Sequence, residues 1–119
     1  MSDEFLKVAT AEINNEISEI QNILNSCQSS LDVSANAAKI QKSTHKIKGL
    51  APMMGKEDLG NLSALLDSLL KKIMNGIIVN EILESLIIAA DEMKKSMTCP
   101  NYNLDKIKQR ISDLSSALS

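Results

Sequence analysis

The segment Ser43-Thr-His-Lys-Ile-Lys-Gly-Leu-Ala-Pro-Met-Met-Gly55 combines the apolar stripe of a helix with the only histidine of the chain. At about 100° per residue, a helix over residues 35–54 gathers its core-facing side chains within less than a third of its circumference. These side chains are Ile40, Thr44, Ile47, Ala51 and Met54, with Leu50 at one edge. Gly55 is a suitable C-terminal stop, and Pro52 should kink or loosen the last turn.

The same spacing of apolar residues recurs along the rest of the chain. It predicts four more helices, over residues 3–28, 56–75, 79–98 and 104–117, joined by short links. Ser2 or Asp3 can cap the first helix, Ser34 the second after a turn over residues 28–34, and Asn80 the fourth. These elements predict an all-α fold in which residues 1–119 form one domain. We expect an antiparallel four-helix bundle with the fifth helix packed beside it.

The composition agrees with a helical fold and excludes several classes of partner. Hydrophobic residues make up 44% of the chain but aromatic residues only 2%, so the core must consist of Leu, Ile, Met and Ala. The net charge of −2 argues against nucleic acid as a partner. No apolar run approaches the ~20 residues that cross a membrane, and the acidic N-terminus lacks the pattern of a signal peptide. We therefore expect a cytoplasmic protein without a membrane partner.

The cysteines and the histidine do not have the spacing of a metal site. Cys27 and Cys99 are far apart in sequence and are expected to be reduced thiols rather than a disulfide. A single histidine cannot supply a Cys/His cluster, nor the Glu-x-x-His pairs of a di-metal oxidase. No metal or bound cofactor is predicted.

His45 is placed on the outer face of its helix, about 160° from Ile47. Such a residue is either an incidental surface histidine or a nucleophile that needs access. Two neighbours favour the second possibility: Gly49 leaves the imidazole edge open, and Lys48, three residues on, can meet a negative group. Asp67 lies about 140° from Leu62, off the core stripe of the third helix. It is a candidate acceptor for the Nδ1–H of His45.

Basic residues dominate the region around His45. No acidic residue occurs from Val33 to Lys56, a region that contains Lys39, Lys42, Lys46, Lys48 and Lys56. This pattern is either an ordinary solvated face or a docking face for an acidic partner. The docking candidates are Gln41, Lys42, Lys46 and Gly49. A helical adaptor with a basic face therefore remains an alternative function.

The segment from His45 to Gly55 resembles the His-x-x-Lys-Gly-x-Ala-x-x-x-Gly signature of histidine phosphotransfer (HPt) domains. The order and spacing of the helices are similar to the N-terminal phosphotransfer domain of chemotaxis histidine kinases of the CheA type. Three positions depart from those relatives: Asp67 replaces a glutamate, Ala64 replaces a frequent second histidine, and Pro52 replaces a small residue.

The resemblance implies a phosphocarrier of two-component signalling rather than an enzyme. His45 would accept the γ-phosphoryl group of ATP from the ATP-binding domain of a histidine kinase. It would then pass the group to an aspartate of a CheY-like response-regulator receiver. Lys48 would support the phosphate charge, Gly49 would give clearance, and Asp67 would orient the imidazole. No cofactor other than this phosphoryl group is implied, and the isolated chain is expected to be monomeric.

Overall fold

The computed structural model describes residues 2–118, which form five α-helices and one short 3₁₀ helix and contain no β-strand. The helices are α1 (Asp3–Asn25), α2 (Ser30–Leu50), η1 (Pro52–Met54), α3 (Glu57–Met74), α4 (Ile82–Thr98) and α5 (Asp105–Ser116). The prediction of an all-α fold is confirmed.

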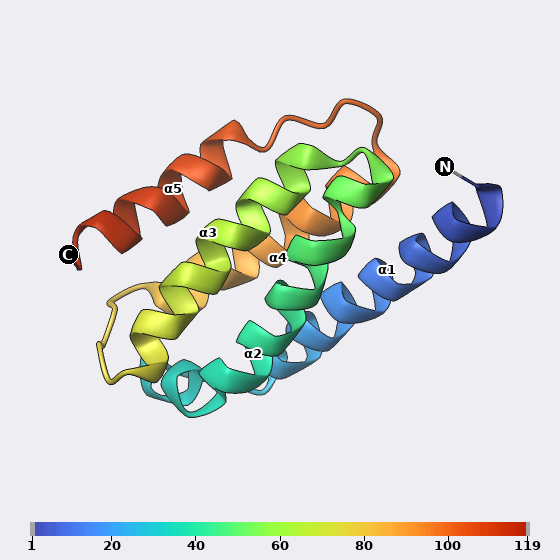
Figure 1. Ribbon diagram of the computed structural model, residues 1–119. Coiled ribbons are helices and arrows are strands. Elements are labelled where there is room, and N and C mark those ends of the chain that lie inside the picture. The colour runs from blue at the N-terminus through green and yellow to red at the C-terminus, as the bar shows by residue number, and fades with distance from the viewer. Residues whose placement is uncertain (1, 119) are drawn as a thin grey trace.

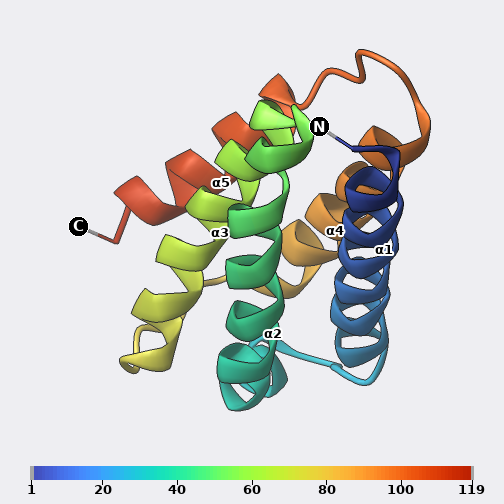
Figure 2. The same ribbon diagram turned by 45° about the vertical axis from the view of Figure 1, so that its right-hand side comes forward.

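The helices pack around one core. α2 lies against both α1 and α3, and α1 also packs on α4. The α1–α2 and α3–α4 links lie at one end of the molecule, and the α2–α3 turn and the α4–α5 link lie at the other (Figures 1 and 2). α5 lies against α3 and α4. Its Ile107 and Ile111 are buried, so α5 completes the core on that side.

Aliphatic side chains at helical spacing form this core. α1 contributes Ile13, Ile17 and Ile20, α3 contributes Leu62, Leu66 and Leu69, and α4 contributes Leu86 and Met93. Full burial of one such side chain stabilises the fold by about 1.5–3 kcal/mol. The predicted core of aliphatic residues is therefore confirmed.

The link between the first two helices is shorter and lies earlier in the sequence than predicted. α1 ends at Asn25 rather than at residue 28, and α2 begins at Ser30 rather than at residue 35. Ser29, not Ser34, is the cap: its side chain accepts a hydrogen bond from the Asp32 N–H. The Asp32 carboxylate in turn accepts the Gln28 N–H at 2.7 Å. With these two hydrogen bonds, most of the expected turn over residues 28–34 becomes the first turn of α2.

α2 also ends earlier than predicted, because of Pro52. The α-helix ends at Leu50, and Pro52 begins the 3₁₀ turn η1. Gly55 follows with φ of 79°, and the Lys56 N–H bonds to the Ala51 carbonyl at 2.9 Å. The left-handed conformation of Gly55 and this hydrogen bond form a C-terminal cap, after which the chain enters α3.

The remaining boundaries need smaller corrections. α3 and α5 begin and end within one residue of their predicted limits. α4 begins at Ile82 rather than at residue 79, and its N-cap is Glu81, whose φ is 64°, rather than Asn80. Within residues 2–118, no helix is both long enough and apolar enough to cross a membrane.

Candidate functional site

His45 lies on the outer face of α2, as the sequence predicts. Ile40, Thr44 and Ile47 are buried on the opposite face of the helix. The side chain of His45 remains 63% exposed. Partners in solution can therefore reach the imidazole directly.

Asp67 is buried, which corrects its predicted place on an outer face. Its side chain is only 2% exposed. Its side of α3, which also carries the buried Gly60 and Ser63, packs against α2. The hydrophobic stripe of α3 does not reveal this second buried side, because the buried residues on it are small or polar.

The two carboxylate oxygens of Asp67 meet four side chains. Oδ1 accepts a hydrogen bond from Nε2 of Gln41 at 2.5 Å and lies 3.7 Å from Nδ1 of His45. Oδ2 lies 3.2 Å from Nζ of Lys71 and 3.7 Å from Nζ of Lys48. Each oxygen thus has one close partner and one more distant partner. At 3.7 Å, the His45 and Asp67 atoms are beyond hydrogen-bonding distance.

The surroundings of Asp67 keep it ionised. Burial is the strongest single influence on its pKa and raises it, because desolvation disfavours the charge. The hydrogen bonds from Gln41 and Lys71 and the charges of Lys71 and Lys48 together outweigh burial. They hold the pKa of the Asp67 carboxyl below its ordinary value. A carboxylate anion therefore lies behind the imidazole at neutral pH.

Two members of this cluster were missed or misassigned in the sequence. Lys71 was not a candidate, although its position four residues after Asp67 is the ordinary spacing of a helical ion pair. The sequence predicts that Gln41 belongs to a docking face, whereas in the structure it is half-buried and donates to Asp67. The signal for this contact in the sequence is the position of Gln41, one turn before His45 on the same helix.

The other predicted site residues have different surroundings. A Cβ atom added at Gly49 would meet no atom within 4 Å, so packing does not require glycine there. This open space agrees with the predicted clearance beside His45. Ala64 is half-buried on α3.

The lysines do not form one continuous face. Lys46 pairs with Glu16 of α1 at 3.4 Å, and Lys48 points to Asp67 of α3. Lys56 donates to the Ser96 carbonyl of α4 at 3.0 Å. Lys39 and Lys42 line a groove together with Lys46, and the groove also contains Glu16 and Glu19. Three lysines of the predicted basic patch thus share one groove with acidic residues, whereas Lys48 and Lys56 contact other elements.

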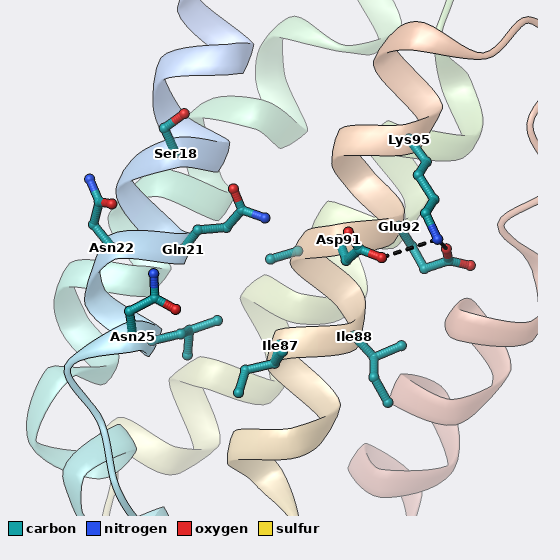
Figure 3. A pocket seen from close by; sticks show the side chains of 11 residues that line it. Ser18, Gln21, Asn22, Asn25, Ile87, Ile88, Asp91, Glu92 and Lys95 are labelled. Carbon is teal, nitrogen blue, oxygen red and sulfur yellow. Dashed lines mark ion pairs between the residues drawn. The ribbon is translucent and has the colours of Figure 1, made fainter.

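A groove of about 600 Å³ lies away from His45, between α1 and α4. One wall carries the polar side chains Ser18, Gln21 and Asn22, and the other carries Ile87 and Ile88 (Figure 3). Lys95 pairs with Asp91 at 3.1 Å beside it. The groove contains none of the residues around His45.

Comparisons of this chain with protein-family models, curated proteins and solved structures found no match.

Proposed function

We propose that this chain is a histidine phosphotransfer domain in which His45 carries the phosphoryl group. The observation that carries the proposal is an exposed imidazole whose Nδ1 lies 3.7 Å from the ionised, buried carboxylate of Asp67. A lysine three residues along the same helix supplies a cation beside them. The proposal includes the finer fold, an antiparallel four-helix bundle with α5 packed beside it.

Phosphorylation would use the outward Nε2 of neutral His45 as the nucleophile. The Nε2 lone pair attacks the γ-phosphorus of ATP, which a histidine kinase holds, and forms an N–P bond. The bond from phosphorus to the bridging oxygen breaks, and ADP leaves with that electron pair. The Nδ1–H stays on the ring, where Asp67 stabilises the positive charge that develops. Lys48 offsets the charge of the phosphoryl oxygens.

In the transfer to the receiver, the imidazole would be the leaving group rather than the nucleophile. A carboxylate oxygen of a receiver aspartate attacks phosphorus, the N–P bond breaks, and its electron pair returns to Nε2. The chain is then a carrier between two proteins rather than an enzyme. Because the donor is an ATP-dependent kinase domain, the proposed setting is the cytoplasm. The proposed partners are that kinase domain and a CheY-like receiver.

Phosphoramidate, a small phosphoryl donor, tests the carrier function without a known kinase. The native chain should form phosphohistidine at His45, seen by ³¹P NMR as an acid-labile, alkali-stable species, faster than the same chain in denaturant. His45→Gln should remove the signal. Asp67→Ala should slow its formation while circular dichroism remains helical. Equal rates in the native and denatured chains would mean that His45 is an ordinary surface histidine.

The adaptor alternative receives less support from the lysines. Two of the basic side chains already have acidic neighbours within the chain: Lys46 pairs with Glu16, and Lys48 lies 3.7 Å from Asp67. A purely structural bundle would also keep its partners when His45 is replaced. Binding that persists in His45→Gln without phosphoryl uptake by the native chain would favour the adaptor.

A further inference from the structure

The side chains of Gln41 and His45 both lie near the same oxygen of Asp67, Oδ1. They lie one turn apart on α2, so their side chains project in similar directions toward α3. The Gln41 amide occupies Oδ1 at 2.5 Å, whereas His45 Nδ1 remains 3.7 Å from it. On the other side of the carboxylate, Lys71 lies closer to Oδ2 than Lys48 does. The carboxylate is therefore held by Gln41 and Lys71, and His45 and Lys48 are left without close contacts to it.

We propose that Gln41 is a positioning residue that keeps Asp67 from hydrogen-bonding His45 in the free protein, and that an acidic partner docking beside His45 releases it. This inference rests on the proposed phosphocarrier function. It adds regulation to that function: the site becomes fully reactive only when a partner draws the Gln41 amide away from Asp67.

The rearrangement that this mechanism needs is small. Closing the 3.7 Å separation to a normal hydrogen bond requires a movement of roughly 0.8 Å. Asp67 can turn about Oδ2, which Lys71 continues to hold. Gln41 is only half-buried, so a group arriving beside His45 can reach its amide.

The chemistry of the amide defines the partner. The Gln41 NH₂ group can leave a carboxylate at little cost only if it finds another acceptor. A partner that presents a carboxylate or a backbone carbonyl near His45 supplies that acceptor. A receiver that offers a reactive aspartate carries such a group. An apolar partner surface would leave the amide on Asp67.

The completed hydrogen bond would change the imidazole in two ways. It would fix the Nδ1–H tautomer, which leaves the lone pair on Nε2, and it would stabilise positive charge on the ring as the N–P bond forms. In the free protein, both effects are weakened by the 3.7 Å separation. The free chain should therefore react with phosphoryl donors more slowly than a chain in which this hydrogen bond is formed.

The test compares Gln41→Ala and Gln41→Met with the wild type by ¹⁵N NMR of His45, at a pH where the imidazole is neutral. Removing the competing amide should shift the ring toward the Nδ1–H tautomer. Phosphoramidate should then phosphorylate His45 about three- to ten-fold faster, the factor that one hydrogen bond of ordinary strength supplies. Adding Asp67→Asn to either variant should abolish both the tautomer shift and the increase in phosphorylation rate.

Gln109 of α5 provides a matched control. Its Nε2 also donates to a carboxylate, that of Asp113 at 2.7 Å, but within another helix. Gln109→Ala should leave the tautomer and the rate of His45 unchanged. If the two Gln41 variants remain folded and keep the wild-type tautomer ratio, the positioning role is overturned.

The two readouts separate this inference from the function on which it rests. A tautomer shift without enzymatic or chemical phosphorylation of any variant would refute the phosphocarrier function but support the Gln41–Asp67 competition. Phosphorylation of His45 without a tautomer shift would support the function and refute the competition.

Discussion

The ring of Pro52 occupies the space that a side chain at Gly60 would need. A Cβ atom built on Gly60 would lie 2.7 Å from Cγ of Pro52, closer than atoms of this kind approach one another. Pro52 is thus matched by a glycine on the facing turn of α3. Together they set how closely the start of α3 approaches the end of α2.

Gly60→Ala should therefore lower the free energy of unfolding by about 1–3 kcal/mol, although alanine normally stabilises a helix. Pro52→Ala should restore most of that loss when combined with Gly60→Ala, since the clash is with the proline ring. Urea unfolding of the two single variants and the double variant measures the coupling. Additive effects would show that the two residues do not compete for space.

The lowered pKa of Asp67 makes stability depend on pH in a defined direction. The unfolded carboxyl, with an ordinary pKa of about 3.9, binds a proton more readily than the folded one. The unfolded state thus holds more protons in acid, and stability falls as pH falls. The contribution of Asp67 is complete above about pH 4–5 and is lost as pH falls through the folded pKa.

Asp67→Asn isolates this contribution. The variant should be less stable than the wild type at neutral pH by about 1–2 kcal/mol, because charged hydrogen bonds are weakened. The difference between the two proteins should shrink below about pH 4. Chemical unfolding of both proteins at several pH values measures this difference. A difference that stays constant into strong acid would contradict the ionised state of Asp67.

Lys48 and Lys71 should differ in their effects, although both lie near Oδ2 of Asp67. Lys48 is on α2, three residues from His45, and can turn toward a phosphoryl group. Lys71 is held closer to Asp67 along its own helix, at 3.2 Å. Lys48→Ala should slow phosphoryl uptake about ten-fold or more, the scale on which one charge-stabilising group acts.

Lys71→Ala should act mainly on stability, with a loss of about 0.5 kcal/mol that is typical of such helical pairs. Its uptake rate should stay near that of the wild type. The rates with phosphoramidate, measured beside unfolding curves, separate the two lysines. Equal slowing in both variants would contradict this division of roles.

The glycine at position 49 should lower the stability of the fold but keep the space beside His45 open to a partner protein. Gly49→Ala should raise the free energy of unfolding by about 1 kcal/mol, because the added methyl group meets only open space. Gly49→Tyr should keep the fold and its reaction with phosphoramidate, yet obstruct transfer to a purified receiver domain. Undiminished transfer from Gly49→Tyr would remove the clearance role of Gly49.

The position of His45 could be predicted because it depends on one helix alone. The spacing of Ile40, Thr44 and Ile47 defines the buried face of α2, and the opposite face follows from helix geometry. The start of α2 was also encoded, in the Ser29-Ser-Leu-Asp32 capping pattern, although the turn residues around it hid the signal.

The burial of Asp67 could not be predicted in the same way. It depends on which side of α3 meets α2, and the buried residues around Asp67 on its side, Gly60 and Ser63, are small rather than large and apolar. A charged residue there looks solvated until its partners Gln41 and Lys71 are known. Side-chain contacts between helices depend on how the helices pack, which the periodicity of one helix does not contain.

The exposure of His45 has a consequence for how a signal would pass through this chain. If His45 carries the phosphoryl group as proposed, its one exposed imidazole cannot contact a donor and an acceptor at the same time, so the two proteins would have to bind in turn. A high concentration of unphosphorylated receiver would then slow the loading of His45 by occupying the same surface. The throughput of the pathway would be greatest at an intermediate receiver concentration, a limit imposed by geometry rather than by affinity.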